Sequence, residues 1–232
     1  MIVTKVVVGS KLHGLDTPKS DTDIRGIFMH PLREKLSPFK TLKTTEWIEG
    51  DIDNTAYELA HFCKEATHGN ATILEVFFSN QILETTPVAE ELRANWLKFM
   101  DTDKFVMASR GYAANQYNKM QLFDPDKRTP KFAVAYVRVL WQCAEYLKTG
   151  VFPCQVTEPY VKQFLMMVKN DFKLDYIPEL TQMFMEMQQR VTDAYANPLL
   201  VKHKPDIEWI EDFIYRSYLR GSGLYYDGMV TP

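Results

Sequence analysis

Cysteine is scarce in this sequence, with three residues, Cys63, Cys143 and Cys154, scattered over 232 positions. This scarcity excludes a disulfide framework as the basis of the fold, and we expect a reducing, cytoplasmic compartment. Long apolar runs are also missing. The longest run covers residues 132–137, far below the ~18 residues that a membrane-spanning helix needs. No apolar segment of the signal-peptide type lies near residue 1, and we therefore expect no membrane partner.

Neither sign of charge dominates the composition. There are 27 Lys and Arg side chains against 30 Asp and Glu, for a net charge of −3 at pH 7. Such a balance gives no overall attraction to nucleic acid, although a local basic segment can still attract a polyanion. Apolar residues make up 46% of the chain, which is enough for a folded protein with a sizeable core and too many for a disordered one.

The pattern of apolar and polar residues changes along the chain. It predicts strands at 2–8, 23–29 and 46–52, a loop at 31–44, and helices at 57–67 and 71–79. Further helices are predicted at 88–99, 103–120, 130–149, 158–171, 177–197 and 206–219. We therefore expect an α+β fold, with a small mixed-sheet domain and flanking helices over 1–102, followed by an all-helical domain over 103–232.

The most informative segment joins the first two predicted strands. Gly9-Ser10 follows the first strand, and Asp21-Thr22-Asp23 opens the second. A glycine lets the backbone approach a ligand closely, and N–H groups at the start of a helix favour anions. The segment is not a Walker A loop, because Leu15-Asp16 stands where Lys followed by Ser or Thr is required.

The two aspartates indicate a metal site. A spacing of two residues on a strand puts Asp21 and Asp23 on the same face. Two carboxylates that point the same way repel each other unless a cation lies between them. Carboxylate oxygens suit Mg²⁺ or Mn²⁺, and two such ions can clamp an in-line phosphoryl displacement. Arg25 alternates in phase with both aspartates, so it can contact a phosphate or hold the pair in place by charge.

Gly9-Ser10, followed after ten residues by Asp21-Thr22-Asp23, resembles the signature of the DNA polymerase β-like nucleotidyltransferase superfamily. Further segments resemble a branch of predicted nucleotidyltransferases from bacteria and their phages. These segments are residues 20–26, Tyr57-Glu58-Leu59 with Phe62, Gly69-Asn70 with Leu74-Glu75, Gly111-Tyr112-Ala113 with Gln116, and Lys131, Arg138, Glu145 and Thr149-Gly150. The resemblance covers about residues 1–150. His13 departs from it, because that branch is expected to have a tyrosine there.

The resemblance implies transfer of a nucleoside monophosphate from an NTP to an acceptor hydroxyl. Two Mg²⁺ or Mn²⁺ ions are the implied cofactors, held by Asp21, Asp23 and a third carboxylate. Gly9 and Ser10 are expected to cradle phosphate oxygens. The protein then contributes positioning and charge neutralisation rather than covalent chemistry.

The third carboxylate is expected on the strand after the aspartate pair. Asp53 is our choice, because it lies four residues before Tyr57-Glu58, the spacing that the family pattern implies. Asp51 shares its strand face and is the alternative. Glu58 is expected instead to open the following helix, where a carboxylate meets the helix dipole favourably.

A polar stripe runs along the predicted helix at 130–149. Lys131, Arg138, Gln142 and Glu145 recur at helical spacing, opposite an apolar face. One interpretation is a solvated face. The other is that Lys131 and Arg138 point at the active-site cleft and hold the β- and γ-phosphates of the NTP.

Three functions remain compatible with these residues. The first is an active metal-dependent nucleotidyltransferase, whose acceptor is an RNA end, a protein or a small molecule. The second is AMP transfer to a partner protein, as in small antitoxin-type members of the superfamily. The third is a nucleotide-binding or interaction module that has lost catalysis. The basic loop at 33–43 favours a polyanionic acceptor slightly.

Overall fold

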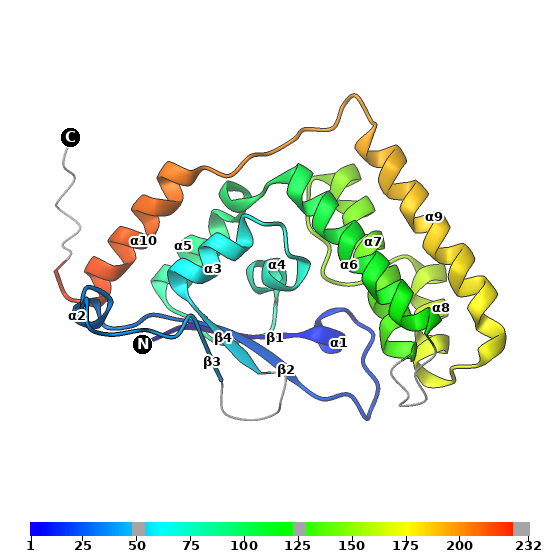
Figure 1. The fold of residues 1–232 in the computed structure, drawn as a ribbon, viewed down its shortest axis with the longest axis horizontal. Coiled ribbons are helices and arrows are strands. Elements are labelled where there is room, and N and C mark those ends of the chain that lie inside the picture. Colours follow the sequence, from blue (N-terminus) through cyan, green and yellow to red (C-terminus); the bar gives the residue numbers. More distant parts are fainter. Residues whose placement is uncertain (48–53, 123–128, 225–232) are drawn as a thin grey trace.

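The computed structural model describes residues 1–47, 54–122 and 129–224. Within these residues, five strands form one mixed sheet in the order β3-β4-β2-β1-β5 (Figure 1). The strands are β1 Ile2–Val8, β2 Asp23–Phe28, β3 Thr45–Trp47, β4 Thr55–Glu58 and β5 Ile82–Glu84. β2 and β4 are parallel, and the other neighbouring pairs are antiparallel.

Helices cover the sheet and continue beyond it. They are α1 Gly9–Leu12, α2 Leu32–Lys35, α3 Leu59–Ala66, α4 Ala71–Phe78, α5 Pro87–Ala94, α6 Thr102–Gln121, α7 Thr129–Thr149, α8 Pro159–Asn170, α9 Ile177–Tyr195 and α10 Ile207–Gly221, with 3₁₀ turns η1 Trp96–Phe99 and η2 Leu174–Tyr176. In Figure 1, α3, α4 and α5 lie above the sheet, and α6 to α9 stand beyond the end of β1 that carries α1. None of these helices in the described residues is long and apolar enough to span a membrane.

One apolar core joins the sheet to the helices. Val3, Val6 and Val8 of β1 are buried in the same cluster as Leu140 of α7 and Val191 of α9. β1 is buried because it is a central strand with helices packed on it, and its β-branched side chains suit that position. The division into two domains at residue 102 stays a prediction.

Helix α10 returns to the N-terminal part of the chain. It packs against η1, α2 and α3, and in Figure 1 it lies beside α2, on the other side of the molecule from α9. Its Arg216 and Arg220 bind the two oxygens of Glu91 on α5 at 2.8 and 2.7 Å. The end of the described chain is therefore held close to the sheet.

The predicted fold class is confirmed: a mixed sheet with flanking helices precedes a helical region. The prediction of helix at Tyr57 and Glu58 is wrong, because these residues end β4 and pair with Ile27 and Phe28 of β2. β5 was not predicted, since its side chains are all exposed and show no alternation. The loop at 31–44 contains the short α2, and residues 48–52 of the third predicted strand lie outside the described residues.

Candidate functional site

The Gly-Ser pair and the second aspartate meet where β1 ends and β2 begins. Val8 pairs with Asp23 in the antiparallel ladder, which brings Gly9 against that carboxylate. Gly9 has φ +68°, and a Cβ there would lie 1.9 Å from Asp23 Oδ2. The position therefore requires glycine for two reasons, the left-handed backbone and the space that the carboxylate occupies.

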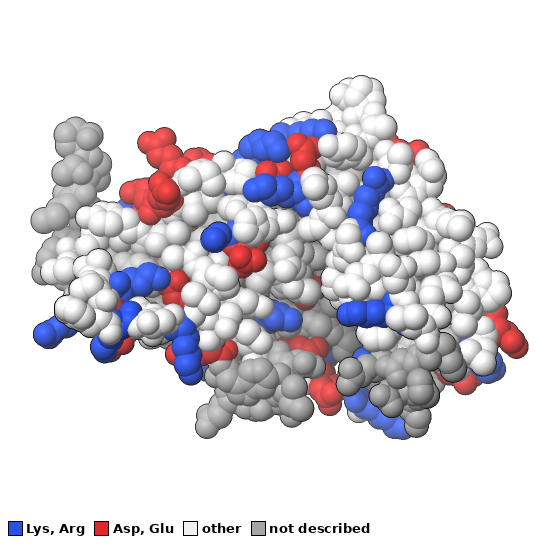
Figure 2. All heavy atoms as spheres, in the orientation of Figure 1, with Lys and Arg blue, Asp and Glu red and all other residues white. Residues whose placement is uncertain are grey.

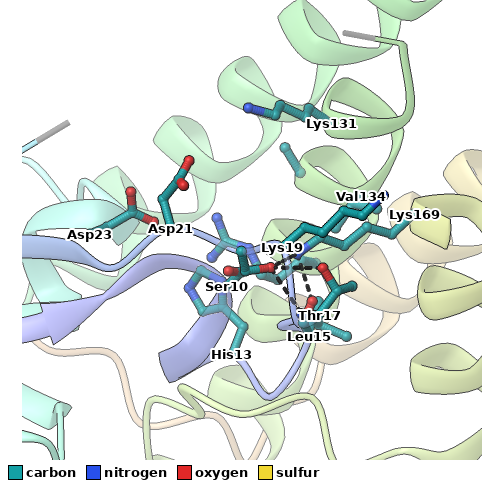
Figure 3. A pocket seen from close by; sticks show the side chains of 13 residues that line it. Ser10, His13, Leu15, Thr17, Lys19, Asp21, Asp23, Lys131, Val134 and Lys169 are labelled. Carbon is teal, nitrogen blue, oxygen red and sulfur yellow. Dashed lines mark hydrogen bonds between the residues drawn. The ribbon is translucent and has the colours of Figure 1, made fainter. Parts of the chain in front are cut away.

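A pocket of about 320 Å³ opens beside this junction, and we call it the main pocket (Figure 3). It lies between the start of β2 and helices α7 and α8. The residues that line it and bear on its chemistry are Ser10, His13, Thr17, Lys19, Ser20, Asp21, Asp23, Lys131, Arg138 and Lys169. In Figure 3, Asp21 and Asp23 extend side by side, and Lys131 approaches from α7.

The aspartate pair fits a divalent metal by its donor chemistry. Asp21 and Asp23 both line the main pocket, although β2 begins at Asp23 and Asp21 lies in the loop before it, so the predicted shared strand face is wrong for Asp21. Carboxylate oxygens are the donors that Mg²⁺ and Mn²⁺ prefer. The described residues hold no cluster of three or more His, Cys, Asp or Glu that could bind a metal. The predicted third ligand, Asp53, and its alternative, Asp51, lie outside the described residues.

Asn54, just before β4, fixes the start of that strand. The buried amide of Asn54 accepts a hydrogen bond from Ile24 N at 2.9 Å, which fixes the start of β4 against β2. Glu58 ends β4 and also caps the start of α3, since its side chain accepts from His61 N at 3.2 Å. Glu58 therefore belongs to the helix start and does not line the main pocket.

Lys169 fixes the loop that carries Asp21. Its Nζ donates to Leu15 O at 2.7 Å and to Ser20 Oγ at 3.2 Å, and Ser20 Oγ also accepts from Thr17 N at 2.9 Å. Burial lowers the pKa of Lys169. Sequence reasoning missed this residue because it lies 154 positions after Leu15, on a helix whose pattern shows only amphipathicity.

The stripe on α7 lies against the main pocket. Lys131 and Arg138, seven positions apart, both line it, so one face of α7 forms a wall of the pocket. The interpretation as a solvated face is wrong for Arg138 and Gln142, which are 6% and 0% exposed. Their polar groups satisfy one another, because Arg138 Nη1 donates to Gln142 Oε1 at 2.8 Å.

Arg138 also belongs to a buried charged cluster. Its Nη1 donates to Glu75 Oε1 at 3.0 Å, and His13 Nε2 lies 2.8 Å from the same oxygen. Burial opposes the charge of Glu75, but the charges and hydrogen bonds of His13 and Arg138 outweigh it and lower the pKa of that carboxyl. Burial and the charge of Arg138 lower the pKa of His13. We take Arg138 as the lasting positive partner, since a guanidinium stays protonated.

A second hollow of about 270 Å³, the Arg25 pocket, adjoins the main pocket. It is lined by Val8, Gly9, His13, Asp23, Arg25, Thr55, Thr72, Glu75 and Arg138. It shares His13, Asp23 and Arg138 with the main pocket. Arg25 Nη1 donates to Tyr57 Oη at 3.1 Å, and its Nε is buried without a hydrogen-bond partner among the described residues. Arg25 therefore lies beside Asp23, as its phase on β2 predicts.

The basic loop is less cationic than its sequence suggests. Lys35 pairs with Glu58 at 3.0 Å and Lys40 with Glu34 at 3.1 Å. Figure 2 shows Lys and Arg interspersed with Asp and Glu over the face in view, without a broad area of one sign. The face in view therefore offers no broad basic surface that would attract a polyanion by its overall field.

Comparison with known proteins adds two findings. The family described as the RNA repair pathway DNA polymerase beta family, RlaP, matches residues 1–206. An uncharacterized 38.9 kDa protein of Enterobacteria phage T4, encoded in the nrdC-mobD intergenic region, is 30% identical over 143 residues. That stretch covers 57% of this chain and 39% of the phage protein.

Proposed function

Because the chain belongs to the RNA repair pathway DNA polymerase beta family, we propose that it is a metal-dependent nucleotidyltransferase acting on RNA ends. The family membership confirms the resemblance to polymerase β-like nucleotidyltransferases. The observation that carries the proposal is the main pocket, in which Asp21 and Asp23 lie beside Ser10 and face cationic side chains of α7 and α8. RNA is proposed as the acceptor because the family is described as part of an RNA repair pathway.

The proposed reaction is an in-line displacement at the α-phosphorus of an NTP. A hydroxyl oxygen of the acceptor bonds to this phosphorus, the bond to the bridging oxygen of the β-phosphate breaks, and pyrophosphate leaves. The hydroxyl proton passes to solvent. Bound Mg²⁺ or Mn²⁺ supplies charge neutralisation and a lower pKa for the attacking hydroxyl.

Each wall of the main pocket has a separate task. Asp21 and Asp23, with Asp53 as the proposed third ligand, hold the metal ions. Ser10 and Lys131 bind the triphosphate, since charged hydrogen bonds to phosphate are the strong ones. Lys169 holds the loop of Asp21 against α8 through Leu15 and Ser20, so it keeps the acidic pair in place.

The first test removes one metal ligand. We expect Asp21→Asn to abolish transfer of label from α-³²P-NTP to a single-stranded RNA with a free 3′-hydroxyl, while the unfolding midpoint holds or rises because a repulsive charge is gone. The control is Asp175→Asn, an exposed aspartate that does not line the main pocket, which should keep full activity.

Three outcomes contradict this proposal. Full activity in Asp21→Asn excludes the metal mechanism. Label that enters protein rather than RNA when a cell extract is supplied supports AMP transfer to a partner protein instead. If the wild-type protein binds NTP but transfers label to no fraction, it is a nucleotide-binding module that has lost catalysis.

The second test separates phosphate binding from general folding. Lys131→Ala should weaken NTP binding by about 1.5–3 kcal/mol, the range for charge-assisted hydrogen bonds. AMP binding should change far less, because AMP lacks the β- and γ-phosphates. Lys148→Ala, at the far end of the same helix and paired with Glu145, is the control. Calorimetric titration with ATP and AMP measures both, and equal losses for the two ligands contradict the assignment.

A further inference from the structure

Two sequence motifs converge away from the metal ligands. Gly69-Asn70 and Gly111-Tyr112 lie on the turn before α4 and in the middle of α6. Asn70 and Tyr112 line one hollow of about 260 Å³, which we call the Tyr112 pocket. Its other polar lining residues include Glu65, His68, Thr72 and Ser109. The main pocket uses none of these residues.

The Tyr112 pocket combines an aromatic ring with hydrogen-bonding groups. Tyr112 is 39% exposed, so its ring lines the pocket and is still reachable from solvent. The Ser109 hydroxyl is buried near the Cys143 thiol and makes no hydrogen bond to nitrogen or oxygen in the described part of the chain. An aromatic face with nearby hydroxyl, amide and carboxylate groups is the environment in which proteins hold an unstacked nucleobase.

The three hollows follow one another. Thr72 lines both the Tyr112 pocket and the Arg25 pocket. Asp23 lines both the Arg25 pocket and the main pocket. The three hollows therefore adjoin in a line, in the order main pocket, Arg25 pocket, Tyr112 pocket.

In-line displacement assigns a direction to this line. The attacking hydroxyl and the leaving pyrophosphate lie on opposite sides of the α-phosphorus. Because the main pocket has the cationic wall for the triphosphate, the acceptor reaches Asp23 from the other hollow that this aspartate lines. That hollow contains Arg25, whose Nε is buried without a partner in the described residues, and a guanidinium is the side chain best suited to a phosphodiester.

We propose that the Arg25 and Tyr112 pockets together form the acceptor groove for the end of a single-stranded RNA. The terminal nucleotide lies in the Arg25 pocket with its hydroxyl at Asp23. Arg25 binds the phosphodiester that follows, and the base of the penultimate nucleotide stacks on Tyr112. This inference rests on the proposed function and adds the acceptor site to it.

The test measures RNA and NTP binding separately from transfer. The probe is a ten-nucleotide single-stranded RNA with a 5′-fluorescein and a free 3′-hydroxyl, titrated by fluorescence anisotropy. Tyr112→Ala should raise the RNA Kd at least about fivefold, the lower end of base stacking on one aromatic ring, and leave the ATP Kd unchanged. The control is Tyr215→Ala, which removes an exposed tyrosine of α10 outside all three pockets and should leave both constants unchanged.

A second variant fills the groove without removing a contact. Ala108 also lines the Tyr112 pocket, and Ala108→Phe should weaken RNA binding with no change in ATP binding or in the unfolding midpoint. RNA affinity that survives both changes overturns the acceptor groove. An equal loss of ATP affinity overturns it too, and assigns the Tyr112 pocket to the base of the NTP. Both results are independent of Asp21→Asn, which tests the chemistry itself.

Discussion

At the scale of single residues, Arg138 contributes both to the stability of the fold and to the lining of the candidate site. Its Nη1 holds Glu75 and Gln142 inside the protein, while the same side chain lines the main pocket and the Arg25 pocket. A guanidinium has five N–H donors in a fixed plane, so it can serve a buried carboxylate and a ligand at once. A lysine, with one nitrogen, cannot reproduce this geometry.

Removal of Arg138 should therefore affect stability as well as binding. We expect Arg138→Ala to lower the free energy of unfolding by about 3–5 kcal/mol, because it leaves the Glu75 carboxylate buried without its permanent partner. The double variant Arg138→Ala with Glu75→Gln should recover a large part of this loss, since no uncompensated charge remains. Urea unfolding of the wild type, Arg138→Ala, Glu75→Gln and the double variant measures the coupling. Additive losses contradict the buried pair.

At the scale of elements, the junction of β1 and α1 sets the position of the acidic pair. Gly9→Ala forces a side chain into the left-handed region, at a cost of about 1–2 kcal/mol, and into the space of Asp23 Oδ2. We expect the unfolding free energy to fall by at least this amount and nucleotidyl transfer to be lost, because Asp23 must move.

The matched control for this junction is another glycine. Gly111 lies within α6, and a Cβ there would meet nothing within 4 Å. Gly111→Ala should therefore raise the unfolding free energy by about 0.5–1 kcal/mol, the helix preference for alanine. If both variants lower stability equally, the special role of Gly9 is refuted. Thermal unfolding followed by circular dichroism distinguishes the outcomes.

The helices and strands differ in how well the sequence predicts them. The long helices α6 to α9 were predicted within about two residues because their apolar periodicity is strong. β4 was hidden, since its Tyr57 and Glu58 continue into α3 without a turn residue and become a strand only through pairing with β2. Asp21, Asp23 and Lys131 could be chosen as candidates from the local sequence, whereas the ion pair of Arg138 with Glu75 joins residues 63 positions apart and has no local signal.

At the scale of the whole molecule, α10 closes the chain onto the sheet through a buried hydrogen bond. Tyr218 Oη donates to Glu58 at the start of α3, and Lys35 of α2 pairs with the same carboxylate. Burial raises the pKa of Glu58, but these hydrogen bonds outweigh burial, so the net pKa of the carboxyl is lowered. Three separate parts of the chain therefore depend on one ionised side chain.

This contact predicts a pH-dependent stability. A carboxyl whose pKa is lower in the folded state stabilises the protein above its unfolded pKa of about 4.3, and the contribution is lost as the pH falls through the folded value. Tyr218→Phe should lower the unfolding free energy by about 1.5–3 kcal/mol at pH 7, and the difference from wild type should narrow below pH 4. Tyr215→Phe, on the same helix, is the control, and a pH-independent difference contradicts the assignment.

The hydrogen bonds from Lys169 to the Asp21 loop also affect the order in which the candidate site forms during synthesis. Chains fold as they emerge, N-terminal parts first, and contacts between distant residues form late. The loop that carries Asp21 and the strand that begins at Asp23 are synthesised long before α8, so a growing chain has its acidic pair without the anchor at Leu15 and Ser20. The wall from α7 arrives late as well. Under the proposed function, we therefore expect a nascent chain to gain its nucleotide site only when the helical region docks.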